Sequence, residues 1–175
     1  MKSMIGTPAP EWSCAAYVNG ENKTIGNKDF AGKWHILYWY PLDFTFVCPT
    51  EIQGFQANLE NFQDDGVEVI GCSTDSYFSH KAWFEDGKTF PEKITHPVIA
   101  DTAHAVTRAF GVLNEEMGVG YRATIVVDPE GIIRSYQVND LSVGRSPDEI
   151  LRTVQAFQSG GLCGADWKKG EEFVA

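Results

Sequence analysis

The sequence lacks the features that would place the chain in a membrane or on a nucleic acid. No apolar run approaches the ~20 residues that a membrane-spanning helix needs. The N-terminus shows no apolar segment of the kind that directs secretion. Positive charge is also scarce, because 14 Lys and Arg oppose 24 Asp and Glu and leave a net charge of −10. Such a field repels phosphate backbones, so we expect no nucleic-acid partner, no membrane partner and a cytoplasmic location.

Paired cysteines are missing as well. Cys14, Cys48, Cys72 and Cys163 form no C-x-x-C pair, which argues against a zinc ribbon and against a thioredoxin-type redox pair. The four histidines show no i, i+4 pairing and no H-E-x-x-H pattern, so we expect no metal site. Packing is our interpretation of Cys14 and Cys72, because a free cysteine is commonly buried as a small apolar residue.

The residues that are present suit one packed α/β domain. The chain has 175 residues, of which 43% are hydrophobic, enough for a sizeable core. Asn19-Gly20 between two short strands predicts an N-terminal hairpin. Strands alternate with helices along the rest of the chain, an order that predicts a central mixed sheet. The expected strands cover residues 34–40, 67–73, 96–100, 123–127 and 132–138. The expected helices run from Pro49 to about Asp64, over residues 77–86, from a cap at Asp101-Thr102 to Phe110, and from a cap at Ser146 to about Gln158.

Residues 40–51 are the stretch around which the rest is arranged. An apolar run leads into it and an amphipathic run leads out, which is typical of strand, loop and helix. Pro49 suits the first helical position, because its missing N–H has no partner to lose there. Cys48 then lies at the helix entrance, where free N–H groups and the helix dipole favour a thiolate. We infer that Cys48 is a reactive thiol and that Thr45 offers a hydroxyl from the same loop.

The pattern Pro41-x-x-x-Thr45-x-x-Cys48, followed by Pro49-x-Glu51, resembles the active-site motif of peroxiredoxins. The likeness is strongest to the bacterial alkyl hydroperoxide reductase C type and extends over essentially the whole chain. It implies a thioredoxin-like fold with a central mixed sheet and an added N-terminal β-hairpin. Residues 1–160 would form this domain and residues 161–175 a C-terminal tail. Pro41, as a member of the motif, counts with the catalytic residues.

The resemblance also implies a reaction. The Cys48 thiolate would attack hydrogen peroxide or an organic hydroperoxide, with Thr45 and Arg122 as activating groups. Arg122 stands at the start of the strand expected at 123–127, as the activating arginine of peroxiredoxins does. Glu51 and Arg145 would form a charge network that positions Arg122, although the residues alone favour surface ion pairing for Arg145. No cofactor is implied, because the thiol itself carries the electrons.

A second cysteine is implied to complete the cycle. The segment Leu162-Cys163-x-Ala165-x-Trp167 resembles the resolving-cysteine motif of typical two-cysteine peroxiredoxins, although Gly164 replaces the usual proline. Cys163, expected to be exposed and mobile, would form a disulfide with the oxidised Cys48 of a partner subunit. The resemblance therefore implies an antiparallel homodimer, assembled into a decameric ring. A thioredoxin-like protein or a flavoprotein disulfide reductase would recycle it.

Other interpretations stay open at this point. Phe44, Phe46 and Trp83 would wall the pocket and help to assemble a ring, with core packing as the alternative. A thiol–disulfide exchange protein on the same fold is a second function, and the absent C-x-x-C argues against it. A ring-forming holdase chaperone, with incidental cysteines, is a third.

We predict that the enzyme resists inactivation by its own substrate. Sensitive peroxiredoxins carry a Gly-Gly-Leu-Gly loop and a C-terminal Tyr-Phe tail that slow disulfide formation, and the sequence contains neither. Dose-dependent inactivation during turnover, followed by mass spectrometry of Cys48, tests this expectation. Sulfinic acid at Cys48 under low-micromolar peroxide would contradict it.

Overall fold

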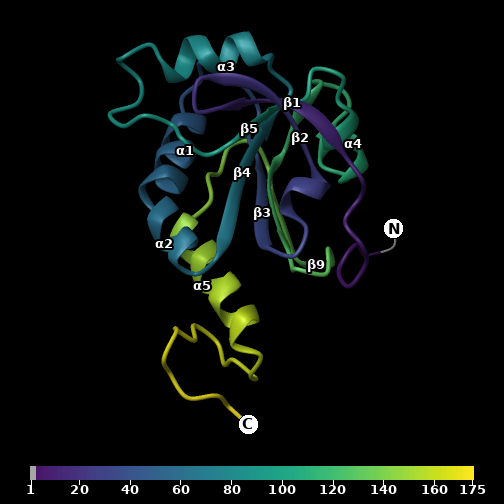
Figure 1. The fold of residues 1–175 in the computed structure, drawn as a ribbon, viewed down its shortest axis with the longest axis vertical. Coiled ribbons are helices and arrows are strands. Elements are labelled where there is room, and N and C mark those ends of the chain that lie inside the picture. Colours follow the sequence, from purple (N-terminus) through teal and green to yellow (C-terminus); the bar gives the residue numbers. More distant parts are fainter. Residues whose placement is uncertain (1–2) are drawn as a thin grey trace.

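The computed structural model describes residues 3–175, which form a seven-stranded mixed sheet covered by helices on both faces (Figure 1). The strand order is β2-β1-β5-β4-β3-β8-β9. Strands β3 (Trp34–Trp39), β4 (Val67–Ser73) and β5 (Val98–Ala100) run parallel in the centre. All other neighbours in the sheet pair antiparallel. The predicted central mixed sheet is therefore confirmed.

Hairpins form both edges of the sheet. At one edge, β1 (Ser13–Val18) and β2 (Glu21–Gly26) form the predicted N-terminal hairpin. Its turn residues, Asn19 and Gly20, have φ values of 51° and 95°, which only glycine and asparagine adopt readily. At the other edge, β8 (Arg122–Val127) pairs with β9 (Ile133–Asn139).

Two predicted helices differ from expectation for local reasons. The helix expected from Pro49 to about Asp64 is divided at Asn58 into α1 (Cys48–Ala57) and α2 (Leu59–Asp64). Asn58 has a ψ of 2°, and its side chain donates to the Gly54 carbonyl at 3.1 Å. Helix α4 (Ala105–Ala109) is shorter than expected because it begins after His104, but the Asp101 carboxylate caps its first turn as predicted, by accepting from the backbone N–H groups of Ala105 and Thr107. The remaining elements are η1 (Asn27–Phe30), α3 (Tyr77–Phe84), α5 (Pro147–Ser159) and a small hairpin of β6 (Leu113–Asn114) and β7 (Val119–Gly120), which the sequence does not predict.

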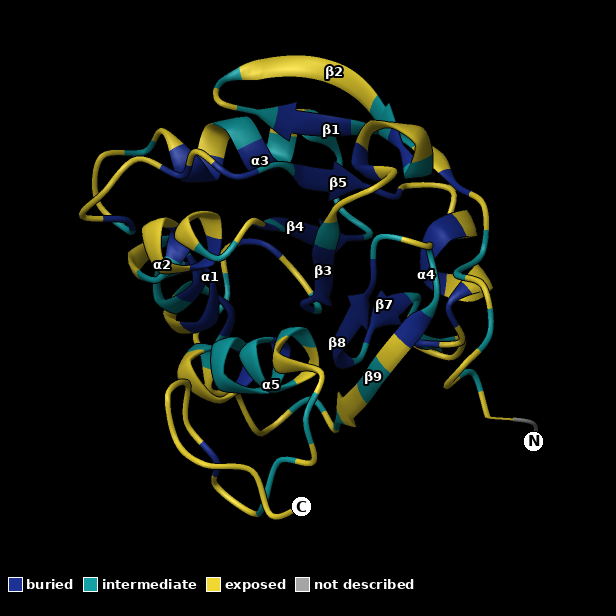
Figure 2. Ribbon diagram, turned by 60° about the horizontal axis from the view of Figure 1, so that its bottom comes forward, coloured by how far each residue is buried: buried dark blue, intermediate teal, exposed yellow. Residues whose placement is uncertain are grey.

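The sheet separates two apolar cores. Figure 2 shows the central strands buried and β2 exposed at the edge. Helices α1, α2, α3 and α5 pack on one face, whereas η1 and α4 pack on the other. Strand β3 contributes to both cores, because its side chains alternate: Tyr38 enters the first and Trp39 the second. Among the described residues, no helix has the length and apolarity to cross a membrane.

One histidine is sealed inside the first core. His96 is 2% exposed, and its ring lies between the Tyr38 hydroxyl, 2.7 Å from Nε2, and the Gln56 carbonyl oxygen, 3.0 Å from Nδ1. Burial lowers the pKa of His96 to about 3. The histidine is therefore neutral in the folded protein and titrates with an ordinary pKa only after unfolding.

This burial predicts a specific loss of stability in mild acid. Between pH 6.5 and pH 3 the unfolded chain binds a proton at His96 that the folded chain does not, so the free energy of unfolding falls as the pH falls. From pH 7 to pH 5 the wild type should lose about 2 kcal/mol more than His96→Leu. Urea denaturation of both proteins at each pH measures the difference. Parallel pH profiles would contradict the prediction.

Candidate active site

Cys48 lies where the chain leaves the sheet and enters a helix. Strand β3 ends at Trp39, and a loop carries the chain to α1, whose first residue is Cys48. Val47 is therefore the cap and Pro49 occupies the second helical position, so the helix begins one residue earlier than the sequence predicts. The Cys48 side chain is completely buried. Phe44 in the loop has a φ of 57°, an uncommon conformation for a bulky residue that bends the chain toward the helix.

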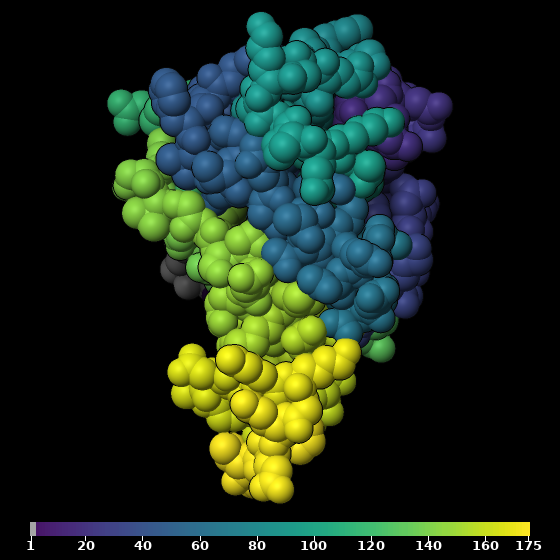
Figure 3. All heavy atoms as spheres, turned by 90° about the vertical axis from the view of Figure 1, so that its left-hand side faces the viewer, coloured from purple at the N-terminus to yellow at the C-terminus, as the bar shows by residue number. Residues whose placement is uncertain are grey.

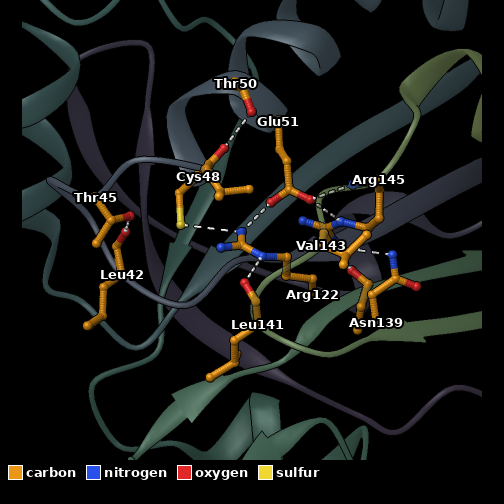
Figure 4. Close-up of polar contacts among 12 residues, drawn as sticks. Leu42, Thr45, Cys48, Thr50, Glu51, Arg122, Asn139, Leu141, Val143 and Arg145 are labelled. Carbon is orange, nitrogen blue, oxygen red and sulfur yellow. Dashed lines mark hydrogen bonds and ion pairs between the residues drawn. The ribbon is translucent and has the colours of Figure 1, made fainter.

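Arg122 reaches the Cys48 sulfur from β8 (Figure 4). Its Nη1 lies 3.5 Å from Cys48 Sγ, as a donor to the sulfur. The same nitrogen donates to Glu51 Oε2 at 2.6 Å, and Nε donates to the Leu141 carbonyl at 2.6 Å. These two contacts hold the guanidinium in place beside the thiol. The sequence motif indicates Arg122, but it gives no sign of the Leu141 contact.

Glu51 joins two arginines inside the protein. It is 2% exposed, and while Oε2 accepts from Arg122, Oε1 accepts from Arg145 Nε at 2.7 Å and from the Arg145 backbone N–H at 2.9 Å. Arg145 also donates to the Ala123 carbonyl and to Thr124 Oγ1. The structure thus brings together Cys48, Arg122, Glu51 and Arg145. The interpretation of Arg145 as a partner in a surface ion pair is wrong, because its side chain is 0% exposed.

The charges of this cluster do not cancel. Two buried guanidinium groups oppose one buried carboxylate, which leaves one positive charge next to a buried sulfur. A charge in a low-dielectric interior requires a partner of opposite sign. A thiolate at Cys48 would supply that partner, and the N-terminus of α1 favours the same ionisation.

Thr45 and Pro41 border the site from the loop. The Thr45 hydroxyl donates to the Leu42 carbonyl at 2.8 Å and makes no hydrogen bond to Cys48. In the view of Figure 4, the Cys48 sulfur lies between Thr45 and Arg122. Since the Thr45 proton is engaged, its oxygen is left to accept a hydrogen bond. Pro41 is half-buried just after β3, where it continues the backbone into the loop.

The sequence gives no signal for a buried polar cluster behind this loop. Asp43 accepts from the Tyr40 hydroxyl at 2.8 Å, and its other oxygen lies 2.8 Å from His80 Nδ1. The Asp43 backbone N–H donates to Asp75 at 3.0 Å. His80, interpreted from the sequence as an ordinary side chain, is fully buried and fixes the loop to α3. Only its contacts, and no sequence pattern, reveal this role.

The aromatic wall expected beside the site is only partly formed. Phe44 and Trp83 are in contact, with ring centroids 5.6 Å apart. Trp83 is also part of the first core, so its side chain both packs in the core and contacts the loop residue Phe44. Phe46, in contrast, is 93% exposed.

Cys163 lies far from Cys48 of the same chain. Residues after α5 form a separate lobe, coloured yellow in Figure 3, and Cys163 is in it. Its sulfur lies 3.3 Å from Ser159 Oγ and 3.6 Å from the Ala156 carbonyl, and it is half-buried instead of exposed as expected. Arg145 stands just before α5, and Cys163 follows that 13-residue helix. The two ends of α5 are about 20 Å apart.

The other two cysteines are unsuited to nucleophilic chemistry. Cys72 is completely buried, and burial raises its pKa well above the ordinary value. Burial also raises the pKa of Cys14 to about 11. Both thiols remain protonated at neutral pH, and for Cys72 the interpretation as a packing residue is confirmed. Among residues 3–175, no three His, Cys, Asp or Glu side chains gather as a metal site would require.

Comparisons with known proteins agree on one family. The model of the AhpC/TSA family matches residues 5–136. The chain is 51% identical over 168 residues to peroxiredoxin 1 of Brugia malayi, and the aligned region covers 91% of this chain and 72% of the relative. AhpC of Enterococcus faecalis is similar in structure, with a TM-score of 0.86, 40% identity, and coverage of 90% of this chain and 94% of that one. The reduced 2-Cys peroxiredoxin of Plasmodium vivax gives a TM-score of 0.92 at 36% identity and covers 98% of this chain and 92% of its own. The predicted thioredoxin-like fold is thereby confirmed.

The buried cluster predicts a large effect of removing the Glu51 charge. Glu51→Gln would leave two guanidinium groups facing a neutral amide, and an unpaired buried charge is costly. We expect the free energy of unfolding to fall by about 3 kcal/mol, measured by urea denaturation. Glu60→Gln, at an exposed position on α2, is the control and should change stability little. Equal effects of the two substitutions would show that the cluster is not coupled.

Proposed function

The chain belongs to the AhpC/TSA family of peroxiredoxins and is a thiol-dependent peroxidase, and we propose that Cys48 is the thiol that attacks the peroxide. One observation carries the assignment: Cys48 begins a helix, is buried, and lies 3.5 Å from Arg122 in a cluster with one excess positive charge. The pKa values of Cys14 and Cys72 are raised, which argues against either as the nucleophile.

The first step forms a sulfenic acid. The Cys48 thiolate attacks one oxygen of the peroxide, a sulfur–oxygen bond forms, and the O–O bond breaks with its electron pair on the leaving oxygen. That oxygen takes up a proton and departs as water or an alcohol. Cys48 is oxidised and the peroxide is reduced. Hydrogen peroxide and organic hydroperoxides are both substrates of this chemistry, which needs no cofactor.

We assign complementary roles to Arg122 and Thr45. Negative charge develops on the peroxide oxygens during the attack, and a fixed guanidinium beside them lowers the barrier. The buried contacts of Arg122 with Glu51 and Leu141 support this role. Thr45 donates its proton to Leu42 and would accept the peroxide O–H, which orients the peroxide for attack. Glu51 and Arg145 act through Arg122, and Pro41 shapes the loop.

We propose that Cys163 of a partner subunit resolves the sulfenic acid. Its thiol condenses with the Cys48 sulfenic acid, a disulfide forms, and water leaves. The ~20 Å length of α5 argues against the same reaction within one chain. Residues 161–175 would thus act as a tail that serves the neighbouring domain, in an antiparallel homodimer. Exposed aromatic side chains at Phe46 (93%) and Phe78 (76%) support further assembly into a decameric ring.

An external dithiol restores the enzyme. Exchange with the Cys48–Cys163 disulfide returns both thiols and oxidises the reductant. A peroxiredoxin takes its electrons from a thiol-based donor, and we propose a thioredoxin-like protein or a flavoprotein disulfide reductase for this chain. Its location in the cytoplasm stays a prediction from the sequence. An insulin-reduction assay would reveal any general thiol–disulfide exchange activity, and an unchanged biological effect of Cys48→Ser would favour a holdase.

The two-cysteine cycle predicts a covalent dimer. One equivalent of peroxide should convert the wild type to a band of twice the monomer mass on a non-reducing gel. Cys48→Ser and Cys163→Ser should each remain monomeric, because either change removes one sulfur of the disulfide. Peroxide consumption should be lost in Cys48→Ser.

Cys14→Ser is a matched control, since Cys14 is half-buried like Cys163 but has a strongly raised pKa. It should behave as the wild type. A wild-type monomer that still consumes peroxide would rule out Cys163 as the intersubunit resolving residue.

A further inference from the structure

Tyr38 occupies the centre of the core beneath the active site. It is completely buried on β3. One contact of its ring is a stack with Phe55 of α1, with centroids 4.0 Å apart and planes at 18°. Another is with Arg145, whose Cζ lies 5.6 Å from the ring centroid. The Arg145 Nη2 is buried without a hydrogen-bond acceptor, so this aromatic face is a favourable neighbour for it. Tyr38 therefore touches the helix of Cys48 and the network of Arg122.

The Tyr38 hydroxyl begins a chain of hydrogen bonds that returns to α1. Its oxygen lies 2.7 Å from His96 Nε2, His96 Nδ1 lies 3.0 Å from Gln56 Oε1, and Gln56 belongs to α1. Ring stacking and hydrogen bonding thus both end on adjacent residues of the same helix, Phe55 and Gln56. The pair of Tyr38 and His96 clamps the second half of α1 to the sheet.

One backbone N–H group fixes which atom donates and which accepts in each of these hydrogen bonds. The Thr95 N–H, which is only a donor, lies 3.0 Å from Gln56 Oε1 and identifies that atom as the acceptor. His96 Nδ1 must then carry the proton that faces Gln56. Its Nε2 is left to accept from Tyr38. Burial raises the pKa of Tyr38 and lowers that of His96, so the phenol stays protonated and the imidazole neutral.

These contacts matter because α1 cannot be rigid throughout the proposed cycle. Cys48 is completely buried, so its oxidised sulfur reaches a partner's Cys163 only if the start of α1 opens. Phe55 lies seven residues after Cys48, two turns along the same face of the helix. An anchor there would end the opening after the first turns and return Cys48 to Arg122 when the helix closes.

We propose that Tyr38 and His96 are positioning residues that anchor the second half of α1 and limit the opening of the Cys48 helix. This inference rests on the proposed two-cysteine cycle. It assigns a role in the reaction to two side chains that form no hydrogen bond with Cys48.

The first test removes only the hydroxyl. Tyr38→Phe keeps both ring contacts and breaks the bond to His96, so the helix should open more readily. We expect disulfide formation after oxidation to be about fivefold faster, the equivalent of one net hydrogen bond. The preceding attack on peroxide should change less than twofold, because the closed state still dominates. Rapid-quench mass spectrometry separates the two steps.

Tyr136→Phe is the matched control. It also removes one phenol hydroxyl, which donates to the Phe110 carbonyl at 2.8 Å, but its neighbours lie on the opposite face of the sheet from α1. It should lower the melting temperature and leave both rates unchanged. An unchanged disulfide rate in Tyr38→Phe, or an equal acceleration in Tyr136→Phe, would overturn the proposal.

A double variant separates positioning from simple stability. Tyr38→Phe alone leaves a buried nitrogen of His96 unpaired, whereas Tyr38→Phe with His96→Leu removes both partners and should recover part of the melting temperature. The link to Gln56 is still absent, so disulfide formation should stay fast. If the rate returned to the wild-type value together with the melting temperature, the pair would have a structural role only.

Amide hydrogen exchange of the reduced proteins tests the anchor without any peroxide. Residues 52–57 of α1 should exchange about fivefold faster in Tyr38→Phe than in Tyr136→Phe. Equal exchange would overturn the anchor even if the two-cysteine cycle holds. Faster exchange in an enzyme that forms no Cys48–Cys163 disulfide would instead support the anchor and refute the proposed cycle.

Discussion

The structure of the site depends on one buried carboxylate between two buried guanidinium groups. Glu51 belongs to the helix that Cys48 begins. Arg122 is the first residue of β8, and Arg145 lies in the loop before α5. Three segments that are far apart in the sequence therefore meet at a single side chain. Buried ion pairs often add little net stability, because desolvation opposes the attraction. What this cluster contributes is an orientation for Arg122 and one uncompensated positive charge, which suits an ionised sulfur.

The register of the sheet makes that meeting possible. Tyr38 of β3 pairs with Thr124 of β8, so Arg122, two residues earlier on the antiparallel strand, lies beside the end of β3. The loop that carries Cys48 leaves from the same end. Shifting this pairing by one residue would turn Arg122 to the other face of the sheet. The chemistry thus depends on strand pairing as much as on the residues of the motif.

Opening and closing place opposite demands on α1. The attack on peroxide needs a closed helix with the sulfur next to Arg122, whereas a disulfide with a partner subunit needs the sulfur outside. A helix held only at Glu51 would lose its position when the first turn opens. The stacking of Phe55 on Tyr38, together with the hydrogen bonds through His96, would keep the rest of the helix on the sheet.

The C-terminal tail, residues 161–175, is attached separately, because Arg152 of α5 donates to the Trp167 carbonyl at 2.8 Å.

Features that depend on neighbouring residues could be predicted from the sequence: the Asn19-Gly20 hairpin, the apolar central strands, the Ser146 cap of α5, and Cys48 at the start of a helix after the Pro41 motif. The motif also pointed to Arg122, Glu51 and Arg145. How these groups are joined, in contrast, depends on the packed fold. The break at Asn58, the proton of Thr45 on Leu42, the engagement of His80 with Asp43 and that of His96 with Tyr38 leave no periodic signal. The physical reason is range: turns and caps form between residues a few positions apart, whereas buried polar groups find partners wherever the packed core brings them.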